Sequence, residues 1–209
     1  MVESTLSPGA AAGARISPAS HLATALDAGS VPGVVEVREQ PFLTMIGVRV
    51  MPRSAAAERI ASVAAALPER SGETSESRDV NVLWLGPQEF LVVAPPEHHR
   101  EAGGTLEIDL LGALGADPGQ IVDLSANRTT FELTGIHAVS VLRKGCGLDL
   151  HPRFFAVGAA VSTEVGGVAV ILWRTGERSY RLMPRASFSE FTVGWLLDAM
   201  REFGSSVTI

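Results

Sequence analysis

Short runs of apolar residues, bounded by Gly, Pro and Ser, predict a chain built largely of β-strands. The clearest runs are 80–86 and 89–95, and the Gly-Pro-Gln sequence between them predicts a hairpin. Both runs are almost continuously apolar, so we expect both faces of this hairpin to be covered. Further strands are expected at 34–38, 42–50, 120–125, 128–134, 159–165, 168–174 and 179–184.

Apolar residues at helical spacing predict helices between these strands. Ser54 begins one helix and Pro68 ends it, with Ala56 and Ile60 on the same face. The polar segment 71–79 is expected to be a loop. Further helices are predicted before Gly29, over 105–115, over about 136–144, and from a capping box at Ser187–Glu190 to about Phe203.

Hairpins outnumber other connections in this pattern. The sequence therefore predicts an α+β fold, with mostly antiparallel sheets and packed helices, rather than a parallel doubly wound sheet. Residues 1–17 are rich in Ala, Ser, Pro and Gly, and are expected to be a disordered tail. Residues 18–209 are expected to form a single domain.

The composition argues against several classes of protein. The formal charge is −6 without basic runs, which argues against nucleic acid as a partner. No apolar run reaches the roughly 18 residues that span a membrane. The first residues lack the basic start and long apolar run of a signal peptide, and the single cysteine, Cys146, fits a reducing compartment. We therefore expect a cytoplasmic protein.

Common catalytic motifs are missing from the sequence. It contains no phosphate-binding G-x-x-x-x-G-K, no G-x-G-x-x-G after a strand, no G-x-S-x-G and no C-x-x-C or H-E-x-x-H. His98 and His99 lie in a Pro-rich loop and are expected to be solvated rather than metal ligands. Arg174 and Arg178 are expected to form a solvated rim. We predict no catalytic, cofactor-binding or metal residues in this chain.

Cys146 follows a predicted helix and stands between two glycines. In one interpretation it is a reactive thiol, with Arg143, Lys144 and His151 lowering its pKa. In the other it is a small residue that packs beside a helix end, where a cation such as Lys144 is also favourable. The pattern favours the packing role.

Two places are candidates for contact with a partner. Asn127 and Arg128, with Asp123, flank two predicted strands, and they either anchor a ligand or partner or form a hydrogen-bonded turn. The last helix has an unusually wide apolar arc that includes Val193, Leu197 and Met200. It is either enclosed by its own sheet and neighbours or packed on another protein from one side.

Several phrases of the sequence together resemble one known family. They are PFLTMIGVRV, VLWLGPQEFLVVAP, VDLSANRTTFELTG, VLRKGCGLDLHPRFF and LWRTGERSYRLMPRASFSEFTVGWLLDA. In this order and spacing, from about Ser17 to about Ala199, they resemble the gamma subunits of heterotetrameric sarcosine oxidase.

This resemblance implies an accessory subunit with the folate-binding fold of the glycine-cleavage aminomethyltransferase. In that family the complex demethylates sarcosine oxidatively to glycine and produces hydrogen peroxide. When tetrahydrofolate is present, methylenetetrahydrofolate is formed as well. The resemblance implies alpha, beta and delta subunits as partners, with FAD, FMN, NAD and zinc in those subunits and none in this chain.

The alternative is a stand-alone folate-binding protein, similar to the aminomethyltransferase or to iron–sulfur repair proteins. Lys144, Gly145 and Cys146 match the Lys-Gly-Cys motif of the repair proteins, but the following Gly147-Leu148-Asp149 departs from it.

Overall fold

The computed structural model describes residues 15–204, which form two compact units. Unit 1 comprises residues 15–17, 42–69 and 75–125; unit 2 comprises 18–41, 70–74 and 126–204. Unit 2 is therefore assembled from segments far apart in the sequence. The expected single domain over 18–209 stays a prediction, as does the tail over 1–17, of which 1–14 lie outside the described residues.

The sheet of unit 1 has the strand order β3-β4-β5-β2-β6, and the first residue of β3 belongs to unit 2. The pairs β4·β5, β5·β2 and β2·β6 are antiparallel, with Val82 opposite Val92 and Ile46 opposite Asp123. The strands are β2 (Thr44–Val50), β3 (Thr74–Ser77), β4 (Val80–Gly86), β5 (Glu89–Ala94) and β6 (Gly119–Asp123). All residues of β5 after Glu89 are buried, which confirms that both faces of this strand are covered; in β4, Asn81, Trp84 and Leu85 are only partly buried.

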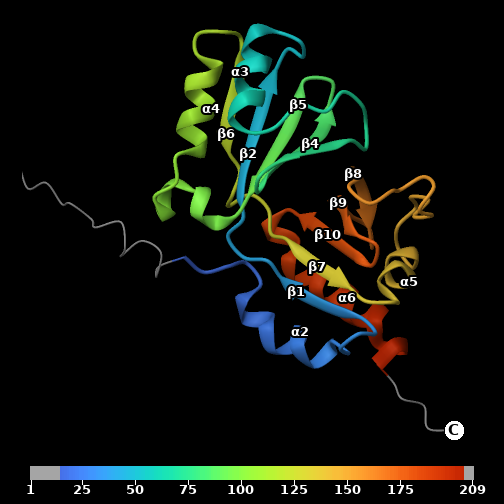
Figure 1. Cartoon of the computed structure of the whole chain (residues 1–209). Helices are drawn as coiled ribbons and strands as arrows, with labels where there is room; N and C mark the ends of the chain where they lie inside the picture. Colours follow the sequence, from blue (N-terminus) through green and yellow to red (C-terminus); the bar gives the residue numbers. More distant parts are fainter. Residues whose placement is uncertain (1–14, 205–209) are drawn as a thin grey trace, which may run out of the picture. The chain divides into compact units, whose positions relative to one another are not determined.

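Two helices, α3 (Ala55–Val63) and α4 (Leu106–Leu114), lie side by side along this sheet (Figure 1). The Ser54 side chain accepts a hydrogen bond from the Ala57 N–H at 3.1 Å and so caps the start of α3, as predicted. Short 3₁₀ turns, η3 (Pro96–His98) and η4 (Arg100–Ala102), precede α4. The core between helices and sheet includes Ile46, Val48, Ile60, Val82, Phe90, Val92 and Leu110.

The sheet of unit 2 has the order β1-β7-β10-β9-β8, and every neighbouring pair is antiparallel. In the central pairs, Leu133 lies opposite Tyr180 and Leu182 opposite Leu172, so the apolar residues of adjacent strands share one face. The strands are β1 (Glu36–Glu39), β7 (Phe131–Thr134), β8 (Ala160–Val165), β9 (Val168–Gly176) and β10 (Ser179–Pro184).

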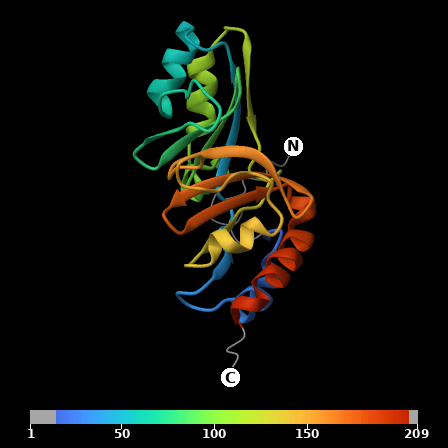
Figure 2. The same cartoon turned by 90° about the vertical axis from the view of Figure 1, so that its right-hand side faces the viewer.

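Helices cover the apolar face of this sheet, and α6 is the longest of them (Figure 2). Leu196 of α6 and Val141 of α5 are fully buried in the same core as Leu133 and Leu172. The elements are η2 (Ser20–Leu22), α2 (Ala23–Gly29), α5 (Ala138–Arg143), η5 (Ala186–Phe188) and α6 (Ser189–Gly204). The two antiparallel sheets with packed helices confirm the predicted α+β class.

Two local predictions differ from the structure. Residues 74–77 form the strand β3 inside the segment predicted to be a loop. This strand is polar because it is the last strand at one edge of its sheet, so its side chains carry no apolar alternation. The last helix begins at Ser189, after the 3₁₀ turn η5, instead of at Ser187.

Arg174 does not belong to a solvated rim, and this prediction is wrong. The residue is only 5% exposed. The guanidinium donates hydrogen bonds to the carbonyl oxygens of Phe155 at 2.7 Å, Glu177 at 3.0 Å and Gly176 at 3.3 Å. A planar fork of donors is suited to several carbonyls at once, so Arg174 ties the loop before β8 to the β9–β10 turn. Arg178 is exposed, as predicted.

Replacing Arg174 with Met should lower the free energy of unfolding by about 2–4 kcal/mol, because the buried Phe155 carbonyl and two partly buried carbonyls lose their donor while the apolar volume stays similar. Urea unfolding measures the change. Arg178→Met is the matched control and should change the value by less than about 0.5 kcal/mol, since that side chain is exposed. Equal effects of the two substitutions would contradict the structural role of Arg174.

Candidate functional site

The apolar arc of α6 divides between core and surface. Val193 and Met200 are 2% and 1% exposed and lie in the core of unit 2. Leu197 is partly buried against that core, and a Cβ on Gly29 would meet its Cδ2 atom. In the described structure Val193 and Met200 therefore present almost no accessible surface, because they pack within this chain. The exposed apolar residues at this helix are Phe188 and Phe191 instead.

Asn127 and Arg128 lie where the chain pairs with the end of β10. The carbonyl of Asn127 accepts a hydrogen bond from the Ala186 N–H at 2.9 Å, and Arg128 forms an isolated antiparallel bridge with Arg185. The Arg128 Nη1 atom donates to the Met183 carbonyl at 2.8 Å. Burial, and then the like charge of Arg185, lower the pKa of Arg128. The Asn127 carbonyl thus takes part in pairing with the segment after β10, and Arg128 is fixed beside a second cation.

Cys146 is partly buried against the core of unit 2. Its backbone pairs with Val165 in an isolated bridge, and its N–H donates to the Leu142 carbonyl at 2.9 Å. Lys144, proposed as an activating cation, instead donates to the Ala199 carbonyl and pairs with Glu202 at 2.7 Å. These contacts hold Lys144 on α6, where it serves helix packing.

His98 and His99 differ in their surroundings. His98 pairs with Asp79 at 2.9 Å between Nε2 and Oδ2. His99 is 6% exposed, so its predicted solvation is wrong. Its Nδ1 accepts a hydrogen bond from the Glu101 N–H at 3.2 Å, and its Nε2 lies 3.0 Å from Asp123 Oδ2. A neutral ring with this arrangement carries its proton on Nε2 and donates it to Asp123.

Asp123 connects this histidine to the end of β6. Its Oδ1 accepts the Ser125 N–H at 2.9 Å, and the Ser125 Oγ accepts the Met45 N–H at 3.0 Å. Burial alone raises the pKa of Asp123, but the hydrogen bonds from Ser125 and His99 together lower it below its ordinary value. Sequence reasoning grouped Asp123 with Arg128; the structure bonds it to His99, a pairing that their separation of 24 positions in the sequence had concealed.

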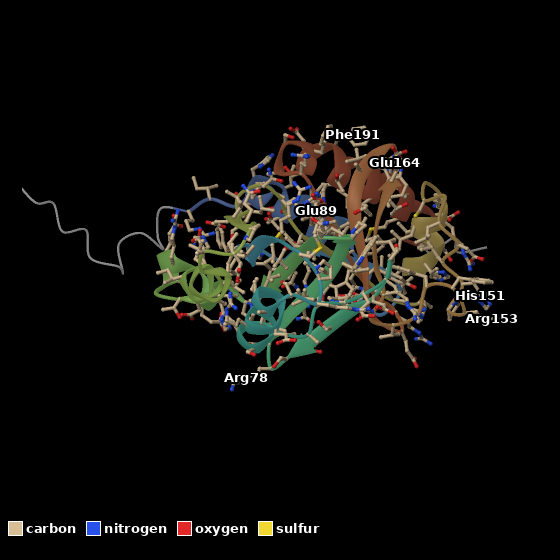
Figure 3. All side chains as sticks on the ribbon, turned by 90° about the horizontal axis from the view of Figure 1, so that it is seen from above. Arg78, Glu89, His151, Arg153, Glu164 and Phe191 are labelled. Carbon is tan, nitrogen blue, oxygen red and sulfur yellow. The ribbon has the colours of Figure 1, made fainter. Side chains whose placement is uncertain are left out.

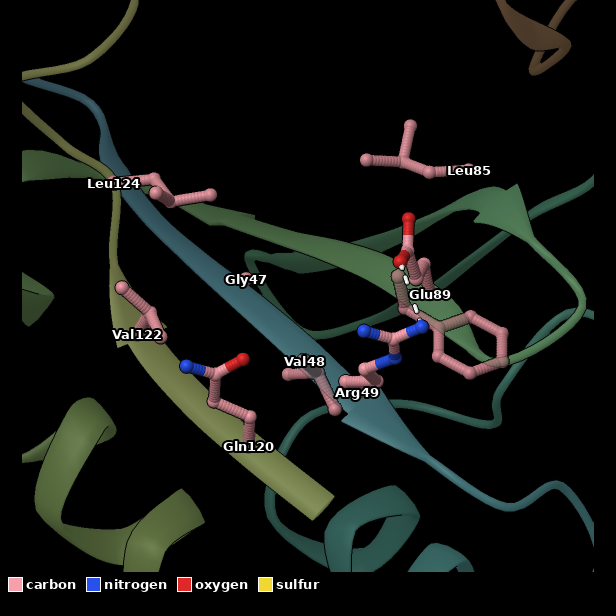
Figure 4. Close-up of a pocket in the computed structure, with 9 residues that line it drawn as sticks. Gly47, Val48, Arg49, Leu85, Glu89, Gln120, Val122 and Leu124 are labelled. Atoms are coloured by element: carbon pink, nitrogen blue, oxygen red, sulfur yellow. Dashed lines mark ion pairs between the residues drawn. The ribbon is translucent and has the colours of Figure 1, made fainter.

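A shallow groove of about 240 Å³ lies on the sheet of unit 1 (Figure 4). Gly47 forms its floor, and Arg49 and Glu89 stand at one end with 3.6 Å between Nη2 and Oε1. The other lining residues are Val48, Leu85, Phe90, Gln120, Val122 and Leu124. The groove offers apolar contact, the Gln120 amide and one carboxylate, Glu89, which is paired with Arg49.

Within residues 15–204, no group of three or more His, Cys, Asp or Glu side chains is arranged to hold a metal ion. The same part of the chain contains no helix that is both long and apolar enough to span a bilayer.

Asp123→Ala should lower the free energy of unfolding by about 1–3 kcal/mol at pH 7, because the His99 N–H loses its buried acceptor. The pKa of Asp123 lies below its ordinary value, so its contribution is complete above about pH 3.9 and disappears as the pH falls through the folded-state pKa. In urea unfolding, the difference in free energy of unfolding between wild type and Asp123→Ala should shrink as the pH is lowered from 7 into the acid range. Asp79→Ala removes the partner of the more exposed His98 and should have a smaller effect at pH 7.

Comparisons with known proteins agree with one another. Residues 54–202 match the model of the family described as "Sarcosine oxidase, gamma subunit family". The sarcosine oxidase subunit gamma of Corynebacterium sp. (strain P-1) is 49% identical over 193 residues, which are 91% of this chain and 92% of that protein. A chain of the heterotetrameric sarcosine oxidase from Corynebacterium sp. U-96 has 46% identity and a TM-score of 0.86, and the match covers 93% of this chain and 99% of that one.

A more distant structure shares only the fold. Aminomethyltransferase T of the glycine cleavage system from Bartonella henselae is 15% identical with a TM-score of 0.60, and the match covers 79% of this chain and 46% of that protein. The fold predicted from the resemblance is thereby confirmed. The family match and the similarity over nearly the whole length of these relatives show that the chain belongs to the sarcosine oxidase gamma subunit family.

Proposed function

We propose that this chain is an accessory subunit of a heterotetrameric sarcosine oxidase, an oxidoreductase complex that demethylates sarcosine to glycine with oxygen as oxidant and hydrogen peroxide as product. The observation that carries the proposal is the match to a chain of a heterotetrameric sarcosine oxidase, with 46% identity over 99% of that chain. The proposed partners are the alpha, beta and delta subunits. The methylenetetrahydrofolate product in the presence of tetrahydrofolate belongs to the same proposal.

We assign this chain a structural role in the complex and place the catalytic groups, with FAD, FMN, NAD and zinc, in the partner subunits. The candidate groups of this chain have other duties that support this assignment. Lys144 is held by Ala199 and Glu202, and Arg174 by backbone carbonyls. His99 and Asp123 satisfy each other within unit 1. A cytoplasmic location remains part of the proposal.

The alternative, a stand-alone folate-binding protein, is less well supported. The similarity to aminomethyltransferase T extends to the fold, at 15% identity, and covers less than half of that protein. Folate binding by the isolated chain, measured by titration calorimetry, would favour this alternative.

The chain expressed alone should show no sarcosine-dependent production of hydrogen peroxide, because we place the redox groups in other subunits. Expressed together with the alpha, beta and delta chains, it should be recovered with them in one active complex. Size-exclusion chromatography and a peroxidase-coupled assay measure both results. Sarcosine oxidation by the isolated chain would overturn the accessory role, and failure to co-purify would overturn the assignment to the complex.

Cys146→Ala should leave the turnover of the assembled complex within about twofold of wild type, because the side chain packs against the core and Lys144 is held elsewhere. Steady-state kinetics of the purified complex test this expectation. A large loss of turnover in a variant that assembles and unfolds like wild type would instead establish a role for the thiol.

A further inference from the structure

Two arginines of unit 2 are held together without a compensating carboxylate. Arg128 and Arg185 are opposite residues of an antiparallel bridge, so their side chains leave the same face of the paired segments. Neither forms an ion pair with any residue between 15 and 204. Like charges directly opposite each other are destabilising, and the lowered pKa of Arg128 reflects burial and this repulsion. The pair therefore carries a local cost that an external anion would relieve.

Exposed aromatic side chains continue from this pair along the start of α6. Phe188, the last residue of η5, and Phe191, in the first turn of α6, are three residues apart, so their side chains lie on the same side of this helical segment. Arg185 is the extended residue immediately before η5. Phe188 is 46% exposed and Phe191 is 54% exposed. In Figure 3, Phe191 projects outward from the helix. We call Arg128, Arg185, Phe188 and Phe191 together the Arg–Phe surface.

The core of unit 2 does not need these phenylalanines. Val193, Leu196 and Met200 fill the contact between α6 and the core, and they are buried. The helix is thus fixed from its inner side, which presents the Arg–Phe surface in one preorganised arrangement. Aromatic residues and arginine are the residue types that most often dominate the binding energy of protein interfaces.

We propose that the Arg–Phe surface binds another subunit of the heterotetramer, at a segment that sets at least one carboxylate against the arginines and apolar side chains against the phenylalanines. The inference rests on the proposed membership of the complex. Charge complementarity determines the occupant: the chain as a whole has a formal charge of −6, so two adjacent unpaired arginines are a local reversal of sign that selects an acidic partner. A second copy of this chain is the competing occupant, and the test below separates the two.

The test uses the complex produced by expressing all four chains together. Arg185→Glu and Phe191→Ser should each reduce recovery of the partner chains with this chain by about tenfold or more. Arg185→Lys keeps the charge and should retain most of the recovery. Higher NaCl should weaken the wild-type complex and change the remaining recovery of Arg185→Glu less.

Arg153 and Phe154 supply a matched control. They are also an exposed arginine and phenylalanine of unit 2, with the guanidinium 6.0 Å from the ring centre, and Arg153 likewise forms no ion pair within the described chain. Arg153→Glu and Phe154→Ser should leave recovery unchanged. Circular dichroism and thermal unfolding establish that each variant is folded. If Phe191→Ser unfolds the chain, Arg185→Glu still decides the question, because Arg185 is exposed and outside the core.

The outcomes separate this inference from the proposed function. If wild type recovers its partners and the Arg185 and Phe191 variants do so equally well, the Arg–Phe surface is not the interface and the function stands. If the control variants lose as much as the test variants, the recognition is not specific to this surface and the inference is wrong. A homodimer that depends on Phe191, with partner recovery intact, also overturns it. If wild type recovers no partner, both proposals are wrong.

Discussion

The packing of α6 on the sheet of unit 2 is the contact on which the arrangement of that unit depends. Leu196 lies at its centre, fully buried. The ring of Trp195 approaches so closely that a Cβ on Gly145 or Gly166 would stand 2.5 or 2.8 Å from it. Those positions therefore require glycine, and they fix the backbone on both sides of the Cys146 bridge. Because the inner side of α6 is committed to this core, a partner has access only to its outer side.

Polar side chains buried in this protein mainly connect loops to strands. Arg174 satisfies carbonyls of a loop and a turn, and the His99–Asp123 pair connects the turn η4 to the end of β6. Such groups are stabilising only when every donor and acceptor is matched, which explains why charged side chains that resemble catalytic candidates in the sequence are already occupied. In contrast, Arg128 and Arg185 are matched by no carboxylate of the described chain. Arg128 also holds the Met183 carbonyl, so what remains unmatched at this pair is its charge.

The sequence predicted the fold well wherever the residue types of one local segment determine its structure. The β4–β5 hairpin was visible because its strands are continuously apolar, and the start of α3 because Ser54 is a good cap. The burial of Arg174 and His99 could not be predicted, since their partners are distant in sequence and each looks polar by itself. Periodicity identified the apolar arc of α6 but not which part the sheet would cover. The strand β3 was not predicted, because backbone pairing at a sheet edge leaves no apolar pattern in the sequence.

The discontinuity of unit 2 has a consequence for the order of events during synthesis. Its core joins Leu26 and Val37 to Leu196 and Met200, whereas most of unit 1 lies in one stretch, 42–125, apart from a short interruption. Unit 1 therefore has nearly all its residues while the ribosome is still making β7, but unit 2 cannot close until α6 has emerged. Until then the part of the core that α6 covers stays exposed, and a chain truncated before α6 lacks Val193, Leu196 and Met200 as well as the outer face of that helix. Closure of unit 2 therefore depends on the synthesis of α6, the last helix that the structure describes.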